Sequence, residues 1–133
     1  MKKEYKFSGD ISGASFIILE DNKITIKRKG FFSMMTHGIK GEKTINISAI
    51  TGVQYKPAGI TIGYLQFVLM GSQESKGGIG NAREDENTVC WGDKKSNKYA
   101  EEIKEYIEKY NSDSVTTNNS SKYDELAKLK KLL

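Results

Sequence analysis

Alternation of apolar and polar residues runs through most of the first 91 residues and predicts β-strands. The clearest case is Lys23 to Lys29, where Ile24 and Ile26 fall on one face and the lysines fall on the other. Asp21 and Asn22 separate this segment from the preceding apolar run, which predicts a hairpin with a two-residue turn. The same pattern predicts seven strands in all, at residues 4–7, 14–20, 23–29, 43–47, 49–55, 60–70 and 87–91.

Two of the predicted strands contain irregularities. Gly52 interrupts the strand at 49–55, and glycine inside a strand is typical of a bulge or a close backbone approach. In the strand at 60–70 the apolar residues change face near Gly63 and Tyr64. We therefore expect a bend or bulge there as well.

The period changes from two residues to that of an α-helix after Asn97. Ser96 or Asn97 is expected to cap the start of this helix. Its apolar residues recur at helical spacing: Tyr99, Ile103, Tyr106, Ile107 and Tyr110. Residues 111–121 contain one apolar residue in eleven and predict a flexible linker. Residues 122–133 predict a second, short helix whose candidate contact residues are Leu126, Leu129, Leu132 and Leu133.

Seven short strands closed by one amphipathic helix predict a mainly β fold over residues 1–110. We expect a small β-barrel or sandwich capped by the helix, followed by the linker and the tail helix. Alternation in the strands and helical spacing afterwards assign a shared core to Ile24, Ile26, Ile45, Ile47, Val53, Leu65, Phe67, Leu69, Trp91, Ile103 and Ile107.

Positive charge gathers in one part of the chain, where it surrounds several large apolar residues. The net charge is +4, but residues 23–43 hold six lysines and arginines against one acidic residue. This segment either folds back onto the core or presents a contact surface, because large apolar side chains rarely stay in water without use. The candidate contact surface consists of Lys27, Arg28, Lys29, Phe31, Phe32, Met34, Met35, Lys40 and Lys43.

The residues offer little for catalysis or metal binding. His37 is the only histidine and Cys90 the only cysteine, so the chain has neither a histidine cluster nor a paired cysteine motif. Cys90 sits in an apolar strand and is interpreted as a small buried residue. We expect no catalytic residue, no metal and no cofactor.

The same composition bears on where the protein resides. A single cysteine excludes an internal disulfide, and the N-terminus lacks the apolar segment of a secretory signal. No stretch of the sequence has the continuous apolar length of a membrane span. We expect a cytoplasmic protein, with peripheral binding at the inner membrane face as an alternative.

Several long phrases resemble a known family. The segments "ITIKRKGFFSMMTHGIKGEKTINISAIT", "VQYKPAGITIGYLQFVL" and "ESKGGIGNAREDENTV" are similar to an uncharacterised family of bacterial and phage proteins with a pleckstrin-homology-like (PH-like) domain. The resemblance covers roughly residues 5–110. It implies a PH-like fold and frequent residence in prophages, but no settled function. The tail "YDELAKLKKLL" resembles the opening of a SHOCT (short C-terminal) domain, over residues 122–133.

Three functions compete on this basis. The first is a non-enzymatic PH-like adaptor that binds a protein or a second copy of itself, with the tail helix as another contact. The second is a peripheral membrane module that binds anionic lipid through the basic Phe/Met segment. Nucleic-acid binding comes third, because the aromatic residues are not interleaved with basic residues on a strand platform.

Overall fold

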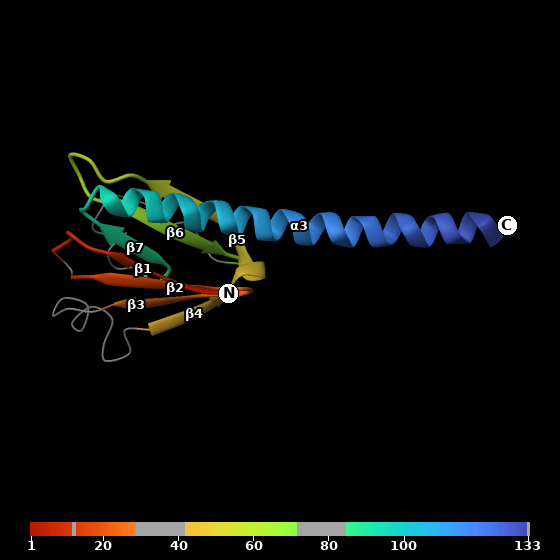
Figure 1. Ribbon diagram of the computed structural model, residues 1–133, viewed down its shortest axis with the longest axis horizontal. Coiled ribbons are helices and arrows are strands. Elements are labelled where there is room, and N and C mark those ends of the chain that lie inside the picture. Colours follow the sequence, from red (N-terminus) through yellow and green to blue (C-terminus); the bar gives the residue numbers. More distant parts are fainter. Residues whose placement is uncertain (12, 29–41, 72–84, 133) are drawn as a thin grey trace.

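The computed structural model describes residues 1–11, 13–28, 42–71 and 85–132, with side chains as far as residue 113. Two antiparallel sheets and one long helix make up this part of the chain (Figure 1). The first sheet has the order β1-β2-β3-β4, with β1 at Lys2–Phe7, β2 at Ser15–Glu20, β3 at Lys23–Arg28 and β4 at Glu42–Asn46. The second has the order β5-β6-β7, with β5 at Ile50–Lys56, β6 at Gly63–Leu69 and β7 at Thr88–Trp91. A short 3-10 turn, η1 at Ile47–Ala49, joins β4 to β5.

The mainly β prediction is confirmed, and all seven predicted strands are present. The hairpin of β2 and β3 pairs Glu20 with Lys23 across the two-residue turn, as the alternation indicates. Of the two predicted alternatives, barrel or sandwich, the described strands do not form a closed barrel, because they are arranged in two separate antiparallel sheets. One face of each sheet packs against the other sheet and against the helix. Because the described strands close neither sheet, each sheet has a strand at either edge.

The two predicted irregularities had different outcomes. The register of β5 against β6 shifts between Ile50 and Gly52, so the bulge is confirmed. The bend inside the strand at 60–70 is wrong, because β6 begins only at Gly63. Gly63 is needed there for space: a Cβ atom on it would lie 2.5 Å from the backbone nitrogen of Ala58.

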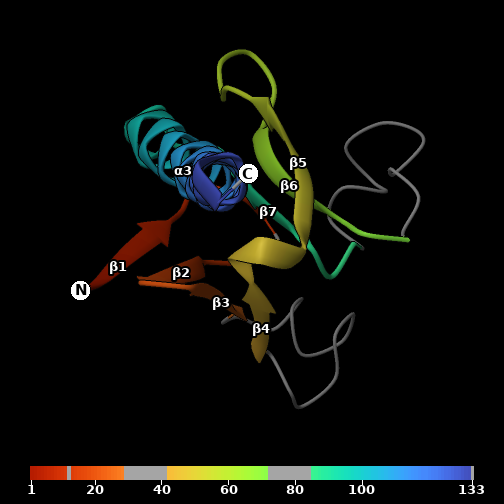
Figure 2. The same ribbon diagram turned by 90° about the vertical axis from the view of Figure 1, so that its right-hand side faces the viewer.

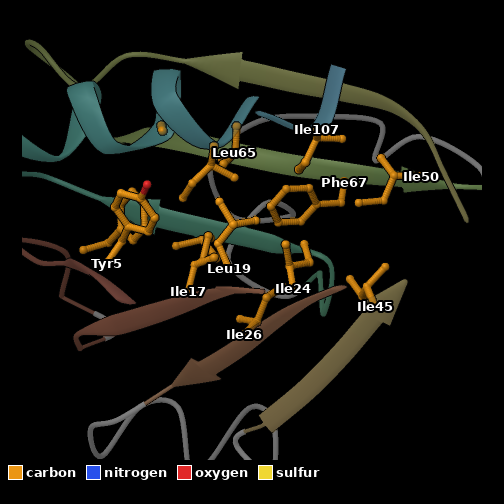
Figure 3. Close-up of a cluster of buried hydrophobic side chains, with 14 of the residues drawn as sticks. Tyr5, Ile17, Leu19, Ile24, Ile26, Ile45, Ile50, Leu65, Phe67 and Ile107 are labelled. Carbon is orange, nitrogen blue, oxygen red and sulfur yellow. The ribbon is translucent and has the colours of Figure 1, made fainter. Parts of the chain in front are cut away.

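The core fills the space between the two sheets and the helix (Figure 3). Every residue that the alternation assigned to the core belongs to this cluster, with Val53 and Leu69 at its partly buried margin. The cluster also takes in Tyr5, Phe7, Ile17, Leu19, Ile50, Ala58, Val89 and Ala100. The core is therefore continuous from the first strand to the first half of the helix.

One continuous helix, α3 (Lys95–Leu132), replaces the predicted helix, linker and tail helix. Residues 111–121 lie inside it, since they contain no proline or glycine and their polar side chains weaken a helix without breaking it. Its start is capped by Asp93, whose Oδ1 accepts the N–H of Lys95 at 2.9 Å, and not by Ser96 or Asn97. At roughly 1.5 Å per residue its 38 residues extend well past the sheets (Figure 1). Among the described residues, no helix is long and apolar enough to cross a membrane.

Candidate functional site

The structure describes only part of the predicted contact surface. Lys27, Arg28 and Lys43 are within the described residues. The other six lie outside them: Lys29, Phe31, Phe32, Met34, Met35 and Lys40. The tail leucines have no described side chains: Leu126, Leu129, Leu132 and Leu133. Contacts through these residues stay predictions.

Arg28 has a structural role that the sequence did not indicate. Its guanidinium donates to the carbonyl oxygens of Asp85 at 3.0 Å and Glu86 at 3.1 Å, and also to that of Thr88. These bonds tie the end of β3 to the start of β7, and thus one sheet to the other. Burial lowers the pKa of Arg28 from its usual value, so the cation is partly withdrawn from solvent. Replacing Arg28 would remove charge-assisted bonds that hold the fold, and lost binding in such a variant would not identify a contact.

Lys43 is also engaged inside the molecule. Its Nζ lies 3.3 Å from Oε2 of Glu86, on the same segment that Arg28 contacts. Lys27 is half-buried on β3. Of the three described members of the predicted surface, two therefore contact the chain just before β7.

A groove on a different face has the features of a binding site. It lies between β5 and α3 and encloses about 470 Å³. Three of its lining residues are apolar and buried or half-buried, namely Ile50, Val53 and Ile107, and most of the others are polar. The lining residues are Ser48, Ile50, Thr51, Gly52, Val53, Ile107, Glu108 and Asn111. Figure 2, viewed along α3, shows the helix end-on with the strands of the second sheet on one side of it. Within that sheet, α3 contacts β5.

Among the described strands, β5 pairs with β6 alone, so in this part of the chain its other side is an open sheet edge. The backbone N–H of Phe67 on β6 donates to Asn87, on the β7 side. Since backbone groups alternate in direction along an antiparallel strand, those of Gln66 and Val68 point toward β5. Their partners on β5 are Gln54 and Gly52. The N–H and C=O groups of Val53 and Tyr55 consequently point away from β6, to the open edge.

Two asparagines of α3 hold the ends of β5 and leave its middle open. Asn97 exchanges two hydrogen bonds with the backbone just beyond β5: its Oδ1 accepts the N–H of Ala58 at 2.7 Å, and its Nδ2 donates to the Ala58 carbonyl at 3.0 Å. At the other end, Nδ2 of Asn111 donates to the carbonyls of Ile47 at 3.2 Å and Ile50 at 3.1 Å. The side-chain amides satisfy backbone groups as a neighbouring strand would. The groove lies at the Asn111 end of this stretch, where its β5 lining runs from Ile50 to Val53.

The α3 side of the groove carries a carboxylate. Among the described residues that line the groove, Glu108 is the charged one. Glu101 lies two helical turns earlier on the same side of α3, because seven residues return a helix to nearly the same face. The pKa of the Tyr55 hydroxyl is raised mainly by burial and to a smaller extent by the negative charge of Glu101. That hydroxyl lies 3.4 Å from the carbonyl of Asn97, and the Tyr55 ring stacks on Trp91.

Sequence reasoning missed this groove, although two signals pointed to it. Asn97 and Asn111 are 14 residues apart, close to four helical turns, so they fall on the same side of α3 as the buried apolar residues. A polar residue on an apolar helix face is expected to have a specific partner. We interpreted Asn97 as a cap and Asn111 as the start of a linker, and so neither was connected to β5.

The remaining reactive groups do not form a site in the described residues. Cys90 is buried on β7, as predicted, and His37 lies outside the described residues. Within the described part of the chain, no group of three or more His, Cys, Asp or Glu residues is arranged to hold a metal ion. The groove between β5 and α3 is thus the strongest candidate.

Comparison with known proteins places the chain in a family without an assigned function. The family model described as "Domain of unknown function (DUF4429)" matches residues 17–108, so the chain belongs to this family. The matched segment includes β5 and every groove-lining residue except Asn111. No curated protein and no solved structure matches the chain.

Proposed function

We propose that this member of the DUF4429 family is a non-enzymatic adaptor module that binds another protein in the groove between β5 and α3. One observation carries the proposal: the backbone groups of Val53 and Tyr55 face an open sheet edge beside a groove of about 470 Å³. An edge strand presents a template for pairing with another chain, and main-chain hydrogen bonds then supply affinity.

The edge is protected against indiscriminate pairing, which supports a specific role. The bulge at Gly52 interrupts the strand at one end, and Pro57 follows it at the other. Natural proteins use such bulges and prolines to prevent sheets from associating edge to edge. Here these features confine the open part of β5 to a few residues, of which Val53 lines the groove.

The finer assignments belong to the same proposal. A PH-like fold is supported by the sequence resemblance together with two sheets, seven strands and a C-terminal helix. A cytoplasmic location is proposed from the single cysteine, which excludes an internal disulfide. The SHOCT-like tail is proposed as a second contact, since α3 extends past the sheets (Figure 1).

Site-specific photocrosslinking tests the proposed function. Ser48 is exposed and lines the groove, so a benzoylphenylalanine at this position lies within reach of a bound protein. In the cells that naturally express the protein, we expect a discrete adduct with one partner. Adding Val53→Pro should abolish the adduct, because proline removes the outward N–H without removing a bond to β6.

Lys98 provides the control position. It is exposed on α3 and is not among the residues that line the groove. The same photoreactive residue at Lys98 should give no adduct with that partner. Equal yields at both positions, or an adduct that survives Val53→Pro, would exclude the groove as the binding surface.

A separate observation favours the membrane alternative. Two isoleucines are largely exposed: Ile11 at 76% in the β1–β2 connection and Ile60 at 107% in the β5–β6 connection. Both connections lie at the end of the sheets where β3 ends, opposite the end from which α3 extends (Figure 1). Lys27, the penultimate residue of β3, lies at the same end. Exposed apolar side chains together with basic residues are typical of surfaces that contact anionic lipid.

Vesicle flotation tests this alternative. If it holds, the protein floats with phosphatidylserine vesicles at low salt, and the double variant Ile60→Ser with Lys27→Gln floats several-fold less. Arg28 is kept intact because it ties the sheets together. Wild-type protein that stays with the unbound fraction at low salt would rule out this function.

A further inference from the structure

We infer that the groove between β5 and α3 binds an extended segment of a partner protein that pairs with Val53 and Tyr55 and carries a lysine or arginine toward Glu108. This inference rests on the proposed function, and it adds the conformation and the chemistry of the bound segment. The apolar lining of the groove, the free backbone groups and the charge of Glu108 each contribute one part of the argument.

The spacing of the free backbone groups selects an extended segment. Val53 and Tyr55 are two residues apart on a strand, so their outward-pointing N–H and C=O groups repeat about every 6.6–6.8 Å. An added strand repeats its own inward-facing groups at the same interval, whereas a helix has no free groups to offer along its length. The bulge at Gly52 and the proline at 57 limit the paired region. The bound segment therefore pairs over about three to five residues.

The apolar lining of the groove selects an aliphatic residue at the centre. Residues opposite one another in a sheet have side chains on the same face. The residue opposite Val53 therefore projects toward the core side, where Val53 packs and where Ile107 lines the groove. A side chain such as valine would cover both. The residues on either side of it point away from α3.

The negative charge of Glu108 favours a basic residue in the bound segment. This residue would be two positions from the one opposite Val53, so that both side chains lie on the same face of the segment. Glu108 is the charged member of the lining, and Glu101 lies on the same side of α3. Lys104 pairs with Glu108 at 2.8 Å, but the Glu108 side chain remains 57% exposed. An exposed pair of this kind contributes little, so a basic side chain from a bound segment can share or replace it.

A second copy of the chain fits this groove less well than a single segment. β5 of a second copy would bring its own α3, held to it at both ends by Asn97 and Asn111. Two such edges facing each other would place helix beside helix and Glu108 near Glu108. Only a segment without a flanking helix avoids both problems. Self-association through β5 is therefore an outcome of the test and not the inference.

The test uses NMR titration of the full chain with the synthetic peptide acetyl-Lys-Thr-Val-Thr-Lys-amide. Its valine and both lysines lie on one face when the peptide is extended, so either strand direction presents a lysine to Glu108. We expect shifts of the Val53, Tyr55 and Ile107 amide signals. We expect binding about three- to fivefold tighter than that of acetyl-Glu-Thr-Val-Thr-Glu-amide.

Variants assign the effect to the named groups. Glu108→Gln should remove the preference for the lysine peptide, and Glu102→Gln should retain it, because Glu102 faces Lys3 on the other side of α3. Methylation of the valine nitrogen of the peptide should abolish binding of an antiparallel segment, in which the valine N–H points to Val53, and methylation of both threonine nitrogens should abolish binding of a parallel one. Val53→Pro should also abolish binding of the peptide. The backbone N–H of Gln54, which points to β6, should stay protected from hydrogen exchange in this variant.

The outcomes separate this inference from the proposed function. A partner adduct at Ser48 with equal binding of the two peptides would leave protein binding in place and overturn the basic segment. An adduct with the mass of two chains would also overturn it, because the occupant would be a second copy. Peptide shifts elsewhere than at β5 and α3 would refute the groove as the site.

Discussion

Replacing Asn97 with alanine is expected to lower the free energy of unfolding by about 2–4 kcal/mol. The Asn97 side chain makes the two bonds to Ala58 described above, and its Oδ1 also accepts the indole N–H of Trp91 at 2.7 Å. Trp91 is fully buried, so alanine would leave its N–H without an acceptor in the core. An unsatisfied buried donor costs more than the bond itself contributes.

Denaturant unfolding with a matched control checks this result. Lys98 is the next residue and is exposed, so Lys98→Ala should change the stability by less than about 0.5 kcal/mol. The denaturation midpoint of Asn97→Ala should fall while the slope stays unchanged. The indole proton of the single tryptophan should also exchange faster with solvent. Equal midpoints for the two variants would show that Asn97 does not hold β5 to the helix.

Gly92→Ala is expected to destabilise the fold by a similar amount, about 2–4 kcal/mol, for a steric reason. A Cβ atom on Gly92 would lie 2.3 Å from the carbonyl oxygen of Gly9, which is backbone and cannot rotate away. The amides of Gly92 and Asp93 both donate to the Ser8 carbonyl at 3.0 Å. Separating the two segments would weaken these bonds, which join the end of β1 to the end of β7.

Gly59→Ala is the matched control for this second result. A Cβ atom at Gly59 would meet nothing within 4 Å. Alanine there should be neutral or should stabilise the protein by up to about 1 kcal/mol, since it restricts the unfolded chain. Thermal unfolding of both variants distinguishes the effects. Melting temperatures for Gly92→Ala and wild type within one degree or so of each other would contradict the close approach.

The predicted contact surface stays a prediction, and two of its three described members have contacts that the sequence did not indicate. The predicted contact residues were chosen from local composition, but Arg28 bonds three carbonyls and Lys43 pairs with Glu86. A cluster of basic residues in the sequence says nothing about which carbonyls or carboxylates will lie beside it. The groove, in contrast, combines β5 with residues of α3 that lie more than 50 positions later.

The sequence by itself determined the strands, the bulge at Gly52, the apolar core and the helical period after Asn97, because each depends on residues close together in the chain. A strand repeats every two residues and a helix every 3.6, so burial of one face leaves a readable pattern. Local pattern is weakest at residues 111–121, where the polar side chains suggest a linker, whereas α3 continues through these residues in the structure and no proline or glycine interrupts it.

The tertiary structure alone decided that the strands form two sheets and that β5 is an edge with α3 beside it. Strand order depends on which distant segments pair, and one strand carries the same alternation whether a neighbour lies on one side or on both. The roles of Asn97, Asn111 and Arg28 follow from the same cause. Each bonds backbone groups 39 to 64 residues away in the chain, and no local pattern identifies such partners.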